Sequence, residues 1–235
     1  MYQRVAYISL LMVFFLSSCR RDEDYMTIGN PKAMSVSDII RFSGIDNPGI
    51  ADGESPVMLT VHINPISDSL NRQISISTSL GYFSNNDTTI DLTVDGYGDI
   101  HVPLISAKAG IAAIRASIGQ YLTDTSVIFS EAIADDMTFT SDKYVMDTTM
   151  TADLTCTLFR GKGQPTDPVK VGFVVTPDNT SLPSLIAPSF VYTASHVASG
   201  TLANPFHSLG WFSVTAYMLR SATDTLKRSI RVKVE

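Results

Sequence analysis

The sequence predicts an all-β protein built from two β-sandwiches that follow a short leader. From about residue 39 onward, apolar residues alternate with polar residues in many short segments, the pattern of strands with one buried face. Turn-forming Gly, Pro, Asn and Asp separate these segments. No stretch shows a comparable helical period. A chain of 235 residues with 44% apolar side chains can bury two cores of ordinary size.

The leader comes first. Arg4 precedes an apolar run over residues 5–16, which is interrupted only by Ser9. As a helix this run spans about 18 Å, which is less than the roughly 30 Å core of a membrane. A positive start, a short apolar centre and small residues before a cleavage point are typical of a secretory signal peptide.

The end of the run, Leu16-Ser17-Ser18-Cys19, resembles the lipobox of bacterial lipoproteins. The resemblance implies a signal peptide over residues 1–18 and lipidation of Cys19, with palmitate or a similar chain on the new N-terminus. Two or more acyl chains anchor a protein stably, whereas one alone holds it only marginally. An ordinary signal peptide with an unrelated cysteine is the alternative interpretation.

Residues 19–36 form the predicted tether, because the charged stretch 20–25 cannot enter a core. This stretch resembles the acidic motif that follows the cysteine in some Bacteroidetes lipoproteins and implies export to the outer face of the outer membrane. Arg20 and Arg21 depart from the simplest form of that motif. We therefore expect a lipid anchor in the outer membrane with the protein on the cell surface, and a periplasm-facing location stays open.

The first sandwich is predicted over residues 37–131. Its strands follow from period-two rows of apolar residues and from two further apolar segments, 73–78 and 122–129. The rows are Val57, Leu59, Val61 and Ile63; Ile90, Leu92 and Val94; Ile100, Val102 and Leu104; and Ala112, Ile114, Ala116 and Ile118. Asp95-Gly96-Tyr97-Gly98 predicts a tight hairpin turn. This many strands in about ninety residues is typical of a β-sandwich.

Several residues of this module resemble group 1 bacterial immunoglobulin-like domains, the invasin and intimin type. They are the opening segment 51–61, Gly81-Tyr82-Phe83-Ser84, the 95–98 hairpin, and Leu104, Ser106, Gly110 and Ala116. The resemblance covers about residues 39–130 and implies an immunoglobulin-like sandwich with a spacer or adhesive role. The polar insertion at 67–72 departs from the family pattern.

The second sandwich is predicted over residues 132–235, after a short linker at 131–136. Further period-two rows mark its strands: Leu154, Cys156 and Leu158; Val169, Val171, Phe173 and Val175; Phe212, Val214, Ala216 and Met218; and Ile230, Val232 and Val234. The segments that begin at Gly163 and Gly210 resemble a divergent relative of the first module. Cys156 lies on an inward row, so we expect a small buried thiol without a disulfide partner.

Composition excludes several function classes. The formal charge of −6, with no basic cluster, disfavours nucleic acid as a partner. The sequence lacks the common nucleophile, zinc-protease, Cys-x-x-Cys and phosphate-loop motifs. The four histidines are far apart, and the acidic pairs Asp95 with Asp99 and Asp135 with Asp136 match no calcium loop. We expect no enzymatic activity, no cofactor and no metal.

One group of aromatic residues predicts a ligand surface. If Phe212 faces the core, Trp211 and Tyr217 point outward on the same strand, and Phe206 and His207 lie just before it. Aromatic ring faces bury the apolar side of a pyranose, so such a strip suits glycan binding. A cover formed by the preceding loop or by the other module is the alternative.

Together these observations predict a non-enzymatic envelope lipoprotein with an adhesive or surface-structural role, held in the membrane through Cys19. Its expected ligand is a glycan or a surface protein. The alternative function is a glycan-binding accessory lipoprotein of a polysaccharide uptake system. The sequence indicates neither an oligomeric state nor a ligand identity.

Overall fold

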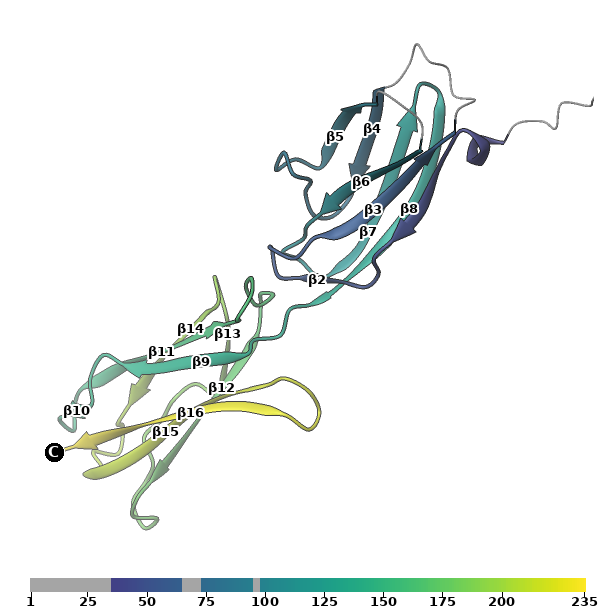
Figure 1. Cartoon of the computed structure of the whole chain (residues 1–235). Helices are drawn as coiled ribbons and strands as arrows, with labels where there is room; N and C mark the ends of the chain where they lie inside the picture. Colours follow the sequence, from purple (N-terminus) through teal and green to yellow (C-terminus); the bar gives the residue numbers. More distant parts are fainter. Residues whose placement is uncertain (1–34, 65–72, 95–97) are drawn as a thin grey trace, which may run out of the picture. The chain divides into compact units, whose positions relative to one another are not determined.

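The chain folds into two β-sandwiches, as the alternating rows predict (Figure 1). The structure is a computed structural model that describes residues 35–64, 73–94 and 98–235. The leader, Cys19, nearly all of the tether, the polar insertion at 67–72 and most of the 95–98 hairpin lie outside the described residues. Residues 36–235 form one compact unit.

The first sandwich consists of two sheets with strand orders β1-β3-β6 and β2-β8-β7-β4-β5. All neighbours are antiparallel except β2, which runs parallel to β8. A 3-10 turn, η2 (Val36–Asp38), comes just before β1. The strands are β1 (Ile40–Ile45), β2 (Gly49–Ala51), β3 (Val57–Ile63), β4 (Gln73–Thr78), β5 (Thr89–Thr93), β6 (Gly98–Leu104), β7 (Gly110–Ile118) and β8 (Tyr121–Glu131).

The second sandwich repeats this topology strand for strand. Its sheets have the orders β9-β11-β14 and β10-β16-β15-β12-β13, and β10 runs parallel to β16 as β2 does to β8. Each strand therefore has a counterpart eight places earlier. The strands are β9 (Asp136–Ser141), β10 (Val145–Met146), β11 (Thr151–Phe159), β12 (Lys170–Pro177), β13 (Phe190–Tyr192), β14 (Val197–Ala203), β15 (Gly210–Leu219) and β16 (Thr225–Val234).

The inward rows build two separate hydrophobic cores. On β3 the residues Val57, Leu59, Val61 and Ile63 are buried and alternate with half-buried neighbours, as predicted. Full burial of such a side chain contributes about 1.5–3 kcal/mol. The same alternation runs through β11, where Cys156 is fully buried with its Sγ 3.8 Å from Sδ of Met137. The prediction that this thiol faces the core is confirmed, and burial raises its pKa to about 11.

The linker is as short as predicted. β8 ends at Glu131 and β9 begins at Asp136, with Ala132 and Ala134 buried between them. Thr166 fastens this segment: its backbone N–H donates to the carbonyl of Ala132, and its hydroxyl accepts the N–H of Ala132 at 2.8 Å. The same hydroxyl donates to the carbonyl of Ala51 at 2.9 Å.

Two further hydrogen bonds join the loop before β12 to the turn after β2. The N–H of Gly163 donates to Oε2 of Glu54 at 2.8 Å, and the N–H of Gln164 donates to the carbonyl of Asp52 at 2.9 Å. The Asp52 carboxylate is itself buried, and it accepts from Ser55 N and Oγ, both at 2.7 Å, and from Glu54 N at 2.9 Å. The segment 51–55 is therefore held both by its own turn and by the 163–166 loop.

Candidate functional site

The predicted lipidation site, Cys19, lies outside the described residues, so it stays a prediction. Within the described part of the chain, no helix is long and apolar enough to cross a membrane. The predicted ligand-binding residues are all described, together with the histidines and most of the acidic side chains.

The acidic and histidine side chains near one another make structural hydrogen bonds. His62 Nδ1 lies 2.8 Å from Asp99 Oδ1, and His101 Nδ1 lies 3.1 Å from the Thr60 hydroxyl, each pair facing across β3 and β6. The His62 imidazole is the largest cause of the lowered pKa of Asp99. No group of three or more His, Cys, Asp or Glu among the described residues is arranged to hold a metal ion.

The two neighbouring carboxylates at the linker, Asp135 and Asp136, accept hydrogen bonds from different segments of the second sandwich. Asp135 Oδ2 accepts the N–H of Gly161 at 2.8 Å, while Asp136 Oδ1 accepts Arg228 Nη2 at 2.5 Å. Each carboxylate thus fastens a separate segment of the second sandwich. Both carboxylates therefore stabilise the start of β9, which begins at Asp136.

Trp211 and Tyr217 both lie on the outward face of β15, because Phe212, Val214 and Ala216 face the core. Six positions separate them, which is about 20 Å along a strand. The outward residues between them are Ser213 and Thr215. The structure therefore places these two aromatic residues on one face but in two separate groups.

The Trp211 ring is stacked against a cation. The guanidinium of Arg231 lies 4.9 Å from the ring centroid, and Arg231 also pairs with the carboxylate of Asp178. Trp211 remains 44% exposed. Phe206 is exposed in the preceding loop, and His207 Nδ1 lies 3.2 Å from the carbonyl of Thr148, so the imidazole faces the turn before β11.

Tyr217 belongs to a second aromatic group at the other end of the sheet. Its ring extends over Gly172 on the neighbouring strand, where the absence of a side chain leaves room for it. On the far side of Gly172, β13 carries Phe190 and Tyr192, whose rings meet edge to face with centroids 5.8 Å apart. Lys170 places its ammonium 4.1 Å from the Phe190 ring centroid.

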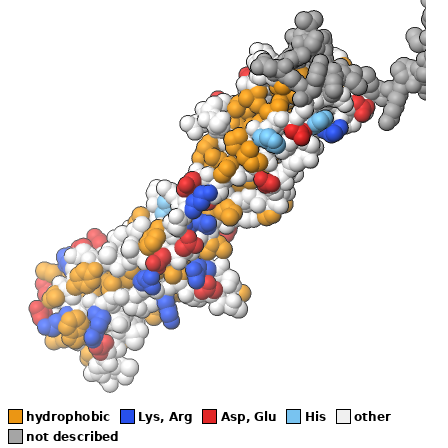
Figure 2. All heavy atoms as spheres, in the orientation of Figure 1, with side chains coloured by type: hydrophobic (Ala, Val, Ile, Leu, Met, Phe, Trp, Pro, Cys, Tyr) orange, Lys and Arg blue, Asp and Glu red, His pale blue; other side chains and the backbone are white. Residues whose placement is uncertain are grey.

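Sequence reasoning missed Phe190 and Tyr192. β13 consists only of Phe190, Val191 and Tyr192. Three residues are too few to show the alternation of buried and exposed side chains that predicts a strand. Both rings are exposed on this short edge strand. In the space-filling view, hydrophobic side chains lie beside both basic and acidic side chains on the visible face of the second sandwich (Figure 2).

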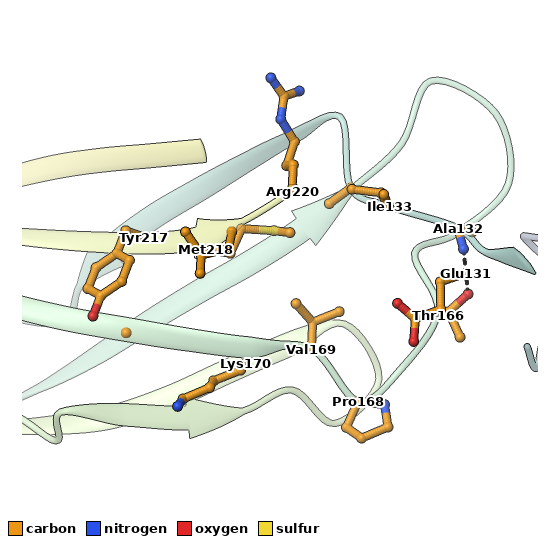
Figure 3. A pocket seen from close by; sticks show the side chains of 13 residues that line it. Glu131, Ala132, Ile133, Thr166, Pro168, Val169, Lys170, Tyr217, Met218 and Arg220 are labelled. Atoms are coloured by element: carbon orange, nitrogen blue, oxygen red, sulfur yellow. Dashed lines mark hydrogen bonds between the residues drawn. The ribbon is translucent and has the colours of Figure 1, made fainter. Parts of the chain in front are cut away.

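A groove of about 340 Å³ lies beside Tyr217 (Figure 3). Its lining comes from the linker, the start of β12 and the end of β15, and includes Glu131, Lys170 and Tyr217. Figure 3 shows Tyr217 and Lys170 together at one end of the groove, with Glu131 near Thr166 at the other end and Arg220 directed away. The acidic and basic ends of the groove are therefore separate.

No protein-family model and no curated protein matches the sequence. Among solved structures, the crystal structure of invasin, described as a bacterial integrin-binding protein, aligns over 83% of this chain with a TM-score of 0.61 and 18% identity. The fold of the chain is that of the aligned immunoglobulin-like part of invasin.

A second invasin-type structure, the Yersinia pseudotuberculosis adhesin InvE, aligns over 84% of the chain with a TM-score of 0.52 and 14% identity. The aligned regions cover only 39% of the invasin chain and 59% of the InvE chain. The predicted pair of immunoglobulin-like sandwiches is confirmed by this likeness and by the repeated topology. At these identities the likeness concerns the fold.

Proposed function

We propose that this chain is a non-enzymatic lipoprotein of the cell envelope whose two immunoglobulin-like sandwiches act in adhesion or surface structure. The observation that carries the proposal is the tandem invasin-type fold, in which one topology occurs twice. Invasin is described as integrin-binding and InvE as an adhesin, which supports a surface protein or glycan as the partner.

The anchor in this proposal is Cys19, after removal of residues 1–18. Residues 19–36 serve as the tether, 37–131 as the first sandwich and 132–235 as the second. The lipobox supports outer-membrane attachment, and the charged stretch 20–25 supports the cell surface over the periplasmic face.

Two measurements test the proposal. Radiolabelled palmitate should enter the protein in cells and should not enter the Cys19→Ala variant. Protease treatment of intact cells should remove the protein from the surface and should leave a periplasmic marker protein intact. Equal labelling of the Cys19→Ala variant argues against the anchor, and survival of the protein on intact cells argues against surface exposure.

The second candidate function is a glycan-binding accessory of a polysaccharide uptake system. The exposed ring of Trp211, with Phe206 and His207 in the loop before it, favours this function. A glycan array separates the two candidates. Selective binding that Trp211→Ala abolishes supports the accessory role, whereas attachment to host cells that is unchanged in Trp211→Ala supports adhesion.

A further inference from the structure

Six residues on the outward face of the second sandwich form one surface, which we call the tyrosine platform. They are Lys170 and Gly172 on β12, Phe190 and Tyr192 on β13, Tyr217 on β15 and Lys227 on β16. Strand register brings them together: Tyr217 faces Lys227 on one side and Gly172 on the other, and Gly172 in turn faces Phe190. Four adjacent strands about 4.8 Å apart give this row a width of about 14 Å.

Aromatic rings dominate the centre of the platform. A Cβ atom on Gly172 would lie 2.3 Å from Cζ and 2.6 Å from the hydroxyl of Tyr217, so the tyrosine ring fills the gap between β15 and Phe190. Tyr192 is 56% exposed and Phe190 is 46% exposed. A contiguous exposed patch of aromatic side chains is typical of a surface that binds a ligand or partner.

The fold itself does not require this surface, because the first sandwich has the same strands without it. On the corresponding strands β4, β5, β7 and β8, one outward row holds Asp91, Ser75, Ser117 and the exposed Leu122, and the next holds Thr89, Ser77, Arg115 and Asp124. There Arg115 is paired with Asp124 at 2.8 Å. In these two rows the first sandwich has no aromatic ring and no lysine, whereas the second sandwich carries the rings and lysines of the tyrosine platform.

The platform lysines differ from the other basic residues on the same sheet. Arg228, Arg231 and Lys233 each pair with a carboxylate. Among the ion pairs of the described residues, none involves Lys170 or Lys227, and both of these side chains are exposed. Two positive charges therefore flank the rings in a protein whose formal charge is −6.

We propose that the tyrosine platform binds an acidic polysaccharide, a chain of pyranose rings that bear carboxylates. The aromatic rings contact the apolar faces of the sugars, and the ammonium groups of Lys170 and Lys227 pair with the carboxylates. An open row about 14 Å wide suits an extended chain of a few rings. Glu131 lies at the far end of the adjoining groove, where it does not oppose the anionic ligand.

This inference rests on the proposed function in one respect: an extracellular glycan reaches the platform only if the protein is exposed on the cell. The test uses the purified full chain in solution, so its outcome is independent of lipidation and of surface location. Absence of glycan binding leaves the anchor and the adhesin proposal intact. A failed protease-shaving experiment, in turn, leaves the binding measurement valid.

The experiment is calorimetric titration with short oligogalacturonates, with their methyl esters as the uncharged counterpart. We expect binding to the acid form, a loss of about tenfold in affinity for each of Lys170→Gln and Tyr192→Ala, and weaker binding at higher salt. Both substituted side chains are exposed, so thermal unfolding should stay as in the parent. Arg115→Gln, on the outward face of the first sandwich, is the matched control and should bind as the parent does.

Three results overturn the proposal. One is absence of binding to oligogalacturonates. Another is equal binding of the methyl esters, which removes the role of the lysines. The third is tighter binding of poly-glutamate than of oligogalacturonate with the same dependence on Lys170 and Tyr192, because that result assigns the platform to an acidic protein partner.

Discussion

Tyr217 occupies the space in front of Gly172, so that no other residue at position 172 leaves the tyrosine where it is. A Cβ atom there would lie 2.3 Å from Cζ of the ring, which is closer than Cβ atoms approach other atoms in proteins. The glycine on β12 and the tyrosine on β15 are thus one structural unit. The aromatic surface of the second sandwich depends on both.

We predict that Gly172→Ala displaces the Tyr217 ring at a small cost in stability. The atoms in the way belong to the far end of a flexible side chain, so the free energy of unfolding should fall by less than about 2 kcal/mol. In a Tyr217→Ala background, Gly172→Ala should change the free energy of unfolding little. A double-mutant cycle measured by urea unfolding gives the coupling energy between residues 172 and 217. An identical cost in both backgrounds would contradict the contact.

Gly163 should resist substitution for a backbone reason. It has φ of +65°, and a Cβ atom would lie 2.6 Å from the carbonyl oxygen of Asp52. Gly163→Ala should therefore lower the free energy of unfolding by about 1–3 kcal/mol. The matched control is Gly161→Ala, where the nearest atom, Oδ2 of Asp135, is 3.7 Å from the added Cβ. Hydrogen exchange at the Gln164 amide should rise only in the Gly163 variant, and similar exchange in both variants would argue against the clash.

The buried thiol of Cys156 should be chemically silent in the folded protein. Burial raises its pKa to about 11, so almost no thiolate is present at neutral pH. In a Cys19→Ala background, a thiol reagent should label Cys156 only after unfolding. Rapid labelling of the folded protein would show that the core position is wrong.

The same pKa shift predicts a pH dependence of stability. The unfolded thiol ionises at about pH 8.5, while the folded thiol stays neutral up to about pH 11. Stability should therefore decline as pH rises between these values, since deprotonation favours the unfolded chain. Lysines and tyrosines also titrate in this range, so the free energy of unfolding is compared with that of Cys156→Ala at each pH. A difference in the free energy of unfolding that does not change with pH in this range would contradict the prediction.

Asp52 should contribute stability that disappears in acid. Burial by itself raises the pKa of this carboxyl, but the hydrogen bonds from Ser55 and Glu54 outweigh burial, and the net pKa lies below its usual value. A carboxylate with a lowered pKa stabilises the fold above about pH 4 and loses that contribution as pH falls through the folded pKa.

Asp52→Ala should consequently lower the free energy of unfolding by about 1–3 kcal/mol at neutral pH, because three donors lose their acceptor. The difference in free energy of unfolding between the parent and Asp52→Ala should decrease as pH falls below about 4. Asp87→Ala is a control for an exposed turn carboxylate and should have a smaller effect. If that difference does not change with pH, the ionised carboxylate of Asp52 is not the source of the stability.

The long strands could be predicted from the sequence, whereas the short ones could not. β3, β11 and β15 each alternate over seven or more residues, so their buried faces follow from period two alone. β2, β10 and β13 have only two or three residues and exist because a neighbouring strand supplies their hydrogen bonds. The identical strand order of the two sandwiches is likewise a property of pairing between distant segments, and the residues that carry it differ between the copies.

The sequence by itself determined the all-β class, the two cores, the burial of Cys156 and the outward direction of Trp211 and Tyr217, because side-chain alternation along one strand decides each of these. The tertiary structure alone decided which outward residues meet. The guanidinium of Arg231 stacks on the ring of Trp211. The register of β12, β13 and β15 sets Gly172 between Tyr217 and Phe190. Register between strands arises from turns and core packing over the whole sheet, and for that reason local periodicity does not contain it.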